Sequence, residues 1–360
     1  LTIGADGSYA YAATTDATDA LDAGESATDT FVYTLSDGTT ITTANLTITV
    51  LGSNDAPVAR DDSGTIVEDG TLTVSDGDGN STISGASFVD SFDVSGQENQ
   101  PFDIAFNTDG TKMFVVGWAG DDVNEYTLST GFDVSTASFV DSFDISSQET
   151  FPTSIAFNSD GTKMFVTGNT GDDVNEYTLS TGFDVSTASF VDSFSVSSQE
   201  TYPIGLAFNT DGTKMFVVGV NGDDVNEYTL STGFDVSTAS FVDSFSVSSQ
   251  ETFPTGLAFS TDGTKMFVVG TSGDDVNEYT LSTGFDVSTA SFVDSFSVSG
   301  QDTFPIGLAF NTDGTKMFVV GYSGDDVNEY TLSTPFSLVN VSGEHTGCLL
   351  YTYDAADEGG

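Results

Sequence analysis

A 51-residue unit that occurs five times in succession constrains the fold of this chain more than any other feature. Five lysines mark the period, and each lies 51 positions after the previous one. The third and fourth units differ at only five of their 51 positions. Such a period indicates one supersecondary unit per copy, packed against its neighbours. The units begin at Ser87, Ser138, Ser189, Ser240 and Ser291.

Each unit contains four strand-like runs separated by turn residues. In the first unit they are Phe88–Val94, Phe102–Phe106, Lys112–Val116 and Val123–Leu128. The third run is apolar on both faces, as a strand buried on both sides must be, whereas the first and fourth include polar residues. Four strands in a unit of this length are typical of a β-propeller blade. The sequence therefore predicts an all-β chain with a propeller of five four-stranded blades.

The end of the repeat array can be arranged in three ways. The run Phe88–Val94 precedes the first complete set of three strands, so it could complete the fifth blade and latch the ring. Phe336–Val341 could instead supply the last outer strand, or the array could stay open. The sequence leaves these three arrangements open.

A different pattern precedes the repeats. Residues 30–35 and 45–51 read as an antiparallel pair around an SDG turn. The stretch GSYAY…ALDAGESATDTFVYTLSDG…LTITVLGSNDAPVA (7–59) resembles a VCBS repeat, a cadherin-like β-sandwich module of large bacterial surface proteins. The repeats are similar to YVTN-type propellers, whose blades carry a DGTK-like turn before an apolar strand. We therefore predict a partial sandwich over 1–57, an acidic linker with a short hairpin over 58–86, a propeller over 87–341 and a C-terminal tail over 342–360.

The charge balance restricts the partners of the chain. It carries 55 acidic and six basic residues, for a formal net charge of −49. Such a surface repels nucleic acid and anionic membranes, and no apolar run is long enough to cross a bilayer. The single cysteine, Cys348, excludes an internal disulfide. With the resemblance to surface proteins, this composition predicts a secreted or surface-attached bacterial fragment whose modules are monomeric parts of a longer chain.

Catalytic signatures are missing from the repeats. The only histidine, His345, lies outside them, so the ring cannot hold a Ser-His-Asp triad. Five near-identical units also do not bring different groups to one point. We therefore expect a protein that is not an enzyme. Two alternatives remain: a lactonase- or esterase-like propeller hydrolase with carboxylates and calcium at the channel mouth, and a purely structural spacer.

One pair of positions varies among copies that are otherwise nearly identical. Trp118-Ala119 becomes Asn169-Thr170, Val220-Asn221, Thr271-Ser272 and Tyr322-Ser323. In a propeller, the loop between the second and third strands shares a face with the loop that leads to the next blade. Four of the five differences between units three and four fall on this face, so we predict that it binds carbohydrate or protein on a cell or matrix surface. The candidate residues are Trp118, Asn169, Tyr202, Val220, Asn221, Phe253, Thr271 and Tyr322.

Calcium is the predicted cofactor. The DGDGN stretch at 76–80 alternates oxygen ligands like the start of a calcium loop, and the alternative is a solvated turn. NDAP at 54–57 resembles the NDxP of cadherin linkers, where the acid helps to hold calcium between modules. The adjacent carboxylates at 121–122 recur in every unit and could instead flank a hairpin. The predicted ligands are Asn54, Asp55, Asp76, Asp78, Asn80, Asp121 and Asp122.

Each unit carries one basic residue, the lysine that precedes its methionine, as at Lys112. It could contact an anion, but we expect it to pair with a neighbouring aspartate. An exposed pair of this kind contributes roughly 0–1 kcal/mol to stability.

Overall fold

The computed structural model describes residues 2–3, 9–10, 26–36, 39–51, 82–83, 85–339 and 341–342. The chain divides into two units, Leu1–Val74 and Ser75–Gly360. In the first unit, β1 (Thr2–Ile3) pairs with β2 (Tyr9–Ala10), and β3 (Ser26–Ser36) pairs with β4 (Ile41–Leu51) in antiparallel register. The predicted strand pair is confirmed.

A cadherin-like sandwich is not formed by the residues described in this first unit, which make only two-stranded sheets. Five predicted calcium ligands lie outside the described residues: Asn54, Asp55, Asp76, Asp78 and Asn80. No helix in the described part of the chain is long and apolar enough to cross a membrane.

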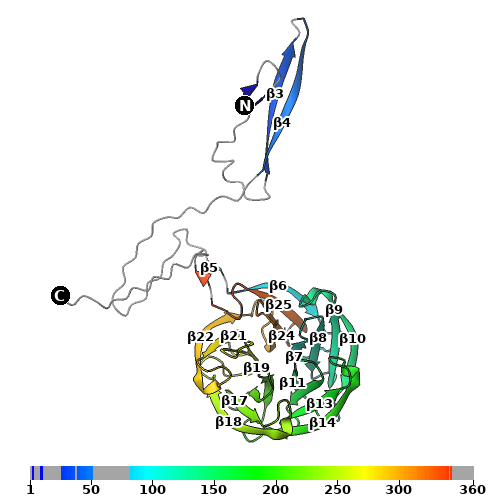
Figure 1. Cartoon of the computed structure of the whole chain (residues 1–360), viewed down its shortest axis with the longest axis vertical. Helices are drawn as coiled ribbons and strands as arrows, with labels where there is room; N and C mark the ends of the chain where they lie inside the picture. The colour runs from blue at the N-terminus through cyan, green and yellow to red at the C-terminus, as the bar shows by residue number, and fades with distance from the viewer. Residues whose placement is uncertain are drawn as a thin grey trace, which may run out of the picture. The chain divides into compact units, whose positions relative to one another are not determined.

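The second unit contains five four-stranded antiparallel sheets arranged in a ring (Figure 1), and we call the region along the axis of this ring the channel. In the first blade, β7 (Pro101–Phe106) lies innermost, followed by β8 (Lys112–Gly117), β9 (Asp122–Leu128) and β10 (Ala137–Asp144). These bounds agree with the predicted strands, and the five-bladed all-β propeller is confirmed.

The remaining blades repeat the first. Their strands are β11 (Pro152–Phe157), β12 (Lys163–Gly168), β13 (Asp173–Leu179) and β14 (Ala188–Ser195); β15 (Pro203–Phe208), β16 (Lys214–Gly219), β17 (Asp224–Leu230) and β18 (Ala239–Ser246); β19 (Pro254–Phe259), β20 (Lys265–Gly270), β21 (Asp275–Leu281) and β22 (Ala290–Ser297); β23 (Pro305–Phe310), β24 (Lys316–Gly321) and β25 (Asp326–Leu332). Short 3-10 turns precede four outer strands: η1 (Val134–Thr136), η2 (Val185–Thr187), η3 (Val236–Thr238) and η4 (Val287–Thr289).

The strand that precedes the first blade closes the ring. β6 (Ala86–Asp93) pairs with β25 as the outer strand of the fifth blade, and the ring of Phe88 lies 5.8 Å from that of Tyr330. The alternative last strand at Phe336–Val341 is wrong. Phe336 adopts a left-handed turn (φ 50°) and packs on Phe310, while β26 (Val341–Ser342) pairs with β5 (Thr82–Ile83).

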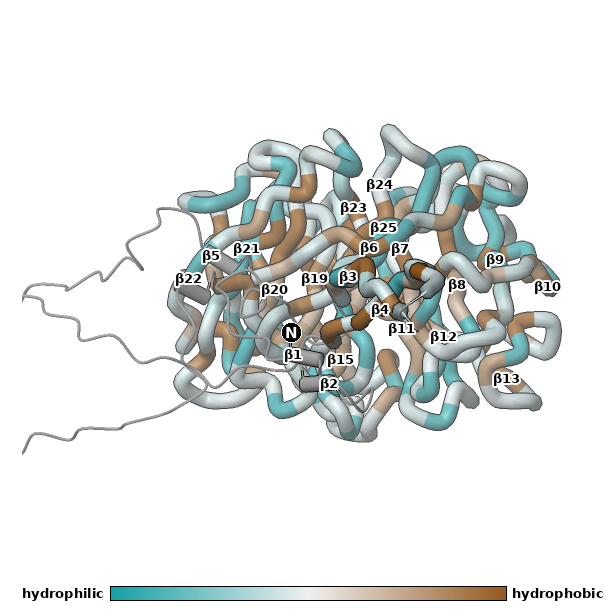
Figure 2. The backbone as a smooth tube through the Cα atoms, turned by 90° about the horizontal axis from the view of Figure 1, so that it is seen from above, coloured by the Kyte–Doolittle hydropathy of each residue, from teal (hydrophilic) through white to brown (hydrophobic). Residues whose placement is uncertain are grey.

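Burial decreases from the middle of each blade to its outer strand. Met113 to Val116 on β8 are fully buried, whereas Phe139 and Val140 on β10 are exposed. Each joint between blades is a separate apolar cluster, such as Phe114 of the first blade with Ile155 and Met164 of the second. Figure 2 shows hydrophobic segments along the strands and hydrophilic segments in the loops. Because each fully buried side chain of this size contributes about 1.5–3 kcal/mol, these joints hold the ring together.

An ion pair also connects each blade to the next. Lys112 Nζ lies 2.7 Å from Glu125 Oε1, and Glu125 Oε2 accepts the main-chain N–H of Val185 in the second blade at 3.1 Å. The lysine side chain is 26% exposed and the glutamate 4%. The predicted aspartate partner is therefore wrong. Lys112 pairs with Glu125 because the two residues share one face of adjacent strands, and this pair is largely buried.

Candidate functional site

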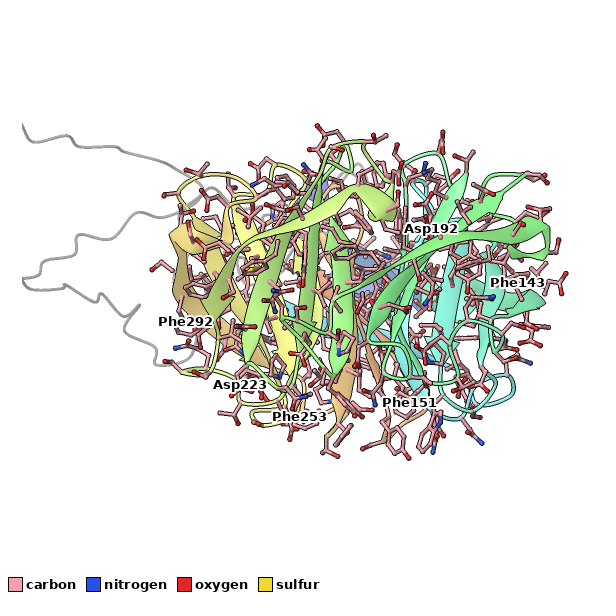
Figure 3. The ribbon with its side chains drawn as sticks, turned by 90° about the horizontal axis from the view of Figure 1, so that it is seen from below. Phe143, Phe151, Asp192, Asp223, Phe253 and Phe292 are labelled. Atoms are coloured by element: carbon pink, nitrogen blue, oxygen red, sulfur yellow. The ribbon has the colours of Figure 1, made fainter. Side chains whose placement is uncertain are left out.

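The loops that vary between copies lie on one face of the ring, which we call the variable face. It consists of loops 118–121 and 145–151 and their counterparts in the other blades. The strand register places them there, because Pro101 pairs with Gly117 at this end of the blade and Phe106 with Met113 at the other. Figure 3 shows Phe151, Phe253 and Asp223 along this edge of the ring.

An apolar cluster lies at the axis of the ring on the variable face. Phe102, Ile204 and Ile306 are buried there, and the predicted site residues Tyr202, Val220 and Phe253 pack against them. This cluster forms because the innermost strands converge on the axis, where their first residues meet. It therefore gives the variable face an apolar centre.

Exposed aromatic rings surround this centre. Trp118 is 46% exposed, and its ring lies 4.7 Å from that of Phe151. Tyr322 is 38% exposed and lies 5.6 Å from Phe304. Gln100 connects the two positions. Its carbonyl accepts the N–H of Trp118 at 3.1 Å, and its amide donates to the Tyr322 hydroxyl at 2.8 Å.

The predicted polar residues of this face are less free to contact a ligand. The amide of Asn221 donates to the Thr201 hydroxyl at 2.6 Å, so one of its donors is already used. Asn169 and Thr271 are half-buried, and their main-chain N–H groups donate to the carbonyls of Phe151 and Phe253 in the preceding loops. Trp118 and Tyr322 are therefore more exposed than Asn169 and Thr271, whereas Asn221 is exposed but already has a hydrogen-bond partner.

A buried carboxylate that sequence analysis missed holds each variable loop. The carboxylate of Glu98 accepts the N–H groups of Gln100 at 2.7 Å, Ala119 at 3.1 Å and Gly120 at 3.3 Å. Burial raises its pKa, and these hydrogen bonds oppose the rise. Since the carboxylate binds the backbone of the variable pair, the side chains can change without altering the loop. The available signal was an acid at the same position in every copy: Glu98, Glu149, Glu200, Glu251 and Asp302.

The adjacent aspartates of each unit have structural contacts. Asp121 adopts φ 50°, and its carbonyl accepts the N–H of Ile145 at 2.9 Å. Asp122 Oδ1 accepts the Asn124 amide at 2.7 Å, and burial raises the pKa of both carboxyls. Among the described residues, no group of three or more His, Cys, Asp or Glu side chains is arranged to hold a metal. Two carboxylates supply fewer oxygens than calcium takes, and their calcium role stays a prediction.

A second carboxylate missed by sequence analysis lies inside the channel. Asp103, on β7, is only 8% exposed. It accepts hydrogen bonds from the Ser154 hydroxyl and from the N–H of Ile155. Burial raises its pKa to about 7, although the hydrogen bonds oppose this shift. A carboxyl group with this pKa can exchange a proton near neutral pH.

Comparisons with known proteins are limited to the fold. No family model matches the chain, and no curated protein matches it. A periplasmic gluconolactonase from Pseudomonas aeruginosa is 16% identical, with 64% of this chain and 66% of that chain covered and a TM-score of 0.40. A putative 6-phosphogluconolactonase from Bacteroides uniformis is 12% identical (61% and 63% covered, TM-score 0.40). A chain of a nidogen/laminin complex is also 12% identical (64% and 74% covered, TM-score 0.43).

These comparisons correct one expectation. The prediction that the chain is not an enzyme is contradicted, because similar solved structures are named gluconolactonase or putative 6-phosphogluconolactonase, which are hydrolases. The chain spans less than two thirds of the length of the two lactonases named above. At these identities and TM-scores, the likeness extends to the propeller and leaves the activity to be argued from the residues.

Proposed function

We propose that the propeller binds a neutral carbohydrate through its variable face. The observation that carries the proposal is the pair of Trp118 and Phe151, two rings 4.7 Å apart at a solvent-exposed position. Aromatic rings beside amide and hydroxyl groups suit sugars, because the rings cover C–H groups and the polar groups bond to hydroxyls. The net charge of −49 disfavours acidic glycans.

The loop construction supports selectivity in this binding. The Glu98 carboxylate and its counterparts fix the loop backbones, so different side chains can be presented on one rigid frame. A rigid frame lowers the entropy lost on binding. If the ligand is repetitive, several weak contacts add through avidity, which fits an adhesive role outside the cell.

A glycan array, with and without EDTA, tests this proposal. We expect Trp118→Ala and Tyr322→Ala to weaken binding by roughly tenfold each, the loss of about 1.4 kcal/mol. Phe190→Ala is the control, because Phe190 is similarly exposed on the outer strand β14, away from the variable loops. Binding that depends equally on Phe190, or no bound glycan at all, contradicts the proposal. Loss of binding in EDTA would support the calcium prediction.

Hydrolysis of a neutral lactone or ester is a second candidate, and Asp103 is the observation that favours it. Its pKa of about 7 would let it accept a proton from an attacking water near neutral pH. Turnover of a chromogenic ester or of gluconolactone, lost in Asp103→Asn with the melting temperature retained, supports this candidate. Equal turnover in both proteins, or none above the buffer rate, removes it.

A further inference from the structure

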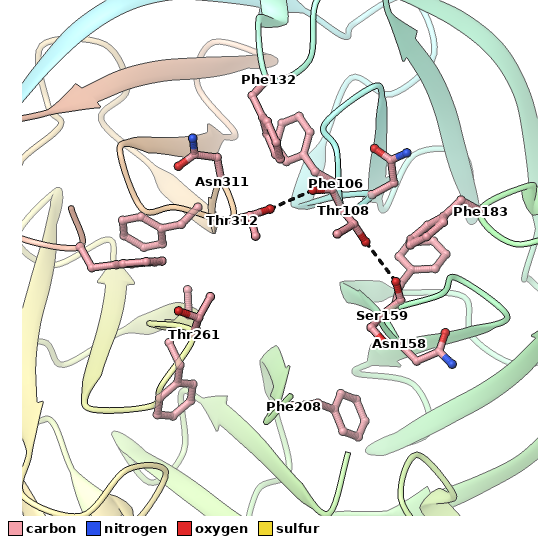
Figure 4. Close-up of a pocket in the computed structure, with 16 residues that line it drawn as sticks. Phe106, Thr108, Phe132, Asn158, Ser159, Phe183, Phe208, Thr261, Asn311 and Thr312 are labelled. Atoms are coloured by element: carbon pink, nitrogen blue, oxygen red, sulfur yellow. Dashed lines mark hydrogen bonds between the residues drawn. The ribbon is translucent and has the colours of Figure 1, made fainter. Parts of the chain in front are cut away.

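A pocket lies at the channel mouth opposite the variable face. It has a volume of about 370 Å³ and is formed by the turns between the first and second strands and the loops between the third and fourth (Figure 4). Half of its sixteen lining residues are phenylalanines, which stand around a central opening. Sequence analysis assigned no role to this face, because its residues hardly change between copies.

The polar part of the pocket wall contains oxygen acceptors beside the side-chain amides of Asn107, Asn158 and Asn311. The Thr108 hydroxyl donates to the carbonyl of Ser159 at 3.0 Å, and the Thr312 hydroxyl donates to the carbonyl of Thr108 at 2.8 Å. Because these hydroxyl protons are used within the wall, the oxygens offer lone pairs to a ligand. None of the lining residues is acidic or basic.

Negative charge surrounds the opening. An aspartate follows each lining hydroxyl residue in the turn, as Asp109 follows Thr108. Hydrogen bonds from the threonine two residues later lower the pKa of these carboxyls, so they are ionised at neutral pH. The nearby lysines are paired with glutamates, as Lys112 is with Glu125, and do not offset this charge.

The aromatic wall is held in a strained backbone conformation. Phe132 adopts φ 59°, a region that bulky residues rarely occupy, and its four counterparts do the same. Its N–H bonds to the carbonyl of Gly110 at 3.0 Å. The ring lies so close that a Cβ on Gly110 would be 2.3 Å from it. Strain of this kind concentrates at ligand sites, and three of these five residues, Phe132, Phe183 and Phe336, line the pocket.

We propose that this pocket binds a small organic cation, a primary or quaternary ammonium compound. Aromatic rings attract such a cation through their faces, the wall oxygens accept from an ammonium N–H or contact its polarised methyl groups, and the acidic rim concentrates cations. An anion is repelled by the same rim. A bare metal ion would lose its water shell to a wall that contains no carboxylate.

Calorimetry with choline and with its neutral isostere, 3,3-dimethylbutan-1-ol, tests the charge requirement. We expect choline to bind roughly tenfold more tightly than the isostere and to be weakened by added salt. Equal affinities, or no binding of choline, would overturn the proposal. Calcium chloride is the inorganic probe, and displacement of choline by calcium at equal concentration would overturn it as well.

Two variants of the full chain test the location. Phe208→Leu removes one wall ring, and Asp211→Asn removes one rim charge while keeping the size of the turn residue. We expect each to weaken choline binding several-fold, and Asp211→Asn also to reduce its salt dependence. Because Phe208 packs on Phe165, the aspartate variant keeps the test valid if the ring variant unfolds. Trp118→Ala, on the opposite face, should bind choline normally. A loss in Trp118→Ala with none in Asp211→Asn would overturn the assignment.

Discussion

Asp103 accepts the main-chain N–H of Ile155, on the neighbouring blade, at 3.0 Å. This bond lies near the axis, where the innermost strands approach one another most closely. A Cβ on Gly307 would be 2.6 Å from the Cα of Asp103, so this part of the channel has no room for a side chain at that glycine. The positions equivalent to Asp103 in the other blades are Ser154, Gly205, Gly256 and Gly307. Asp103 is therefore the one carboxylate at this position in the five blades.

The pKa of Asp103 predicts a pH-dependent stability. It is raised from 3.8 to about 7 by burial, so the protonated group stabilises the folded state fully below about pH 4. That contribution is lost as the pH rises through about 7. We expect it to amount to roughly 2–4 kcal/mol between pH 4 and 8, and Asp103→Asn to remove it. Urea unfolding at both pH values measures the difference. Asp192→Asn, at an exposed position, should keep the wild-type dependence.

The ion pair of the second blade, whose glutamate also contacts the third blade, predicts a stability loss in Lys163→Met. Lys163 Nζ lies 2.6 Å from Glu176 Oε1, and Glu176 Oε2 holds the N–H of Val236 in the next blade. Removing the lysine leaves a buried carboxylate without its cation. We expect a loss of about 1–3 kcal/mol in the free energy of unfolding, less than for a fully buried pair because the lysine is partly exposed.

The double variant Lys163→Met/Glu176→Gln is the matched control for this pair. Glutamine keeps an acceptor for Val236 and carries no charge, so the double variant should be more stable than Lys163→Met alone. Denaturant unfolding of the wild type, Lys163→Met, Glu176→Gln and the double variant completes the cycle. If Lys163→Met is as stable as the wild type, the pair contributes nothing to stability.

Gly161→Ala should destabilise the second blade. Gly161 adopts φ 70°, and an added Cβ would lie 2.2 Å from the ring of Phe183. Both the backbone conformation and the contact oppose a side chain, so we expect a loss of more than about 1 kcal/mol. Gly300→Ala is the control, because a Cβ there meets nothing within 4 Å. If both variants melt at the same temperature, the packing of Phe183 on this turn is not a source of stability.

Ring closure by β6 predicts that one truncation leaves the propeller stable and that a slightly longer one destabilises it. Removing residues 1–74 deletes the first unit and should leave the melting temperature of the propeller unchanged. Removing residues 1–93 also deletes β6 and leaves β25 as an uncovered edge, which favours pairing with other chains. We expect lower cooperativity and higher-order species in size-exclusion chromatography with light scattering. A monomeric protein with an unchanged melt would contradict the latch.

The variable face and the pocket differ in how well the sequence predicted them. The loops that carry Trp118 and Tyr322 were assigned to one face correctly, because strand alternation and loop order follow from the repeat. The pocket around Thr108 and Phe132 was missed, since residues that do not vary between copies give no contrast. Glu98 was missed for a related reason. Its partners at positions 119 and 120 lie two strands later in the chain, and only the folded blade brings them to the carboxylate.

The repeat alone determined the number of blades, the strands of each blade and the residues at each loop, because period-two alternation and turn chemistry act over a few neighbouring residues. Only the tertiary structure decided which strand closes the ring, that Lys112 pairs with Glu125, and that Asp103 occupies the axis. The ion pair depends on which residues share a face of β8 and β9 within one blade. The closure by β6 joins strands more than 200 residues apart and the Asp103 contact joins two blades, so both exist only when the copies curve into a closed ring.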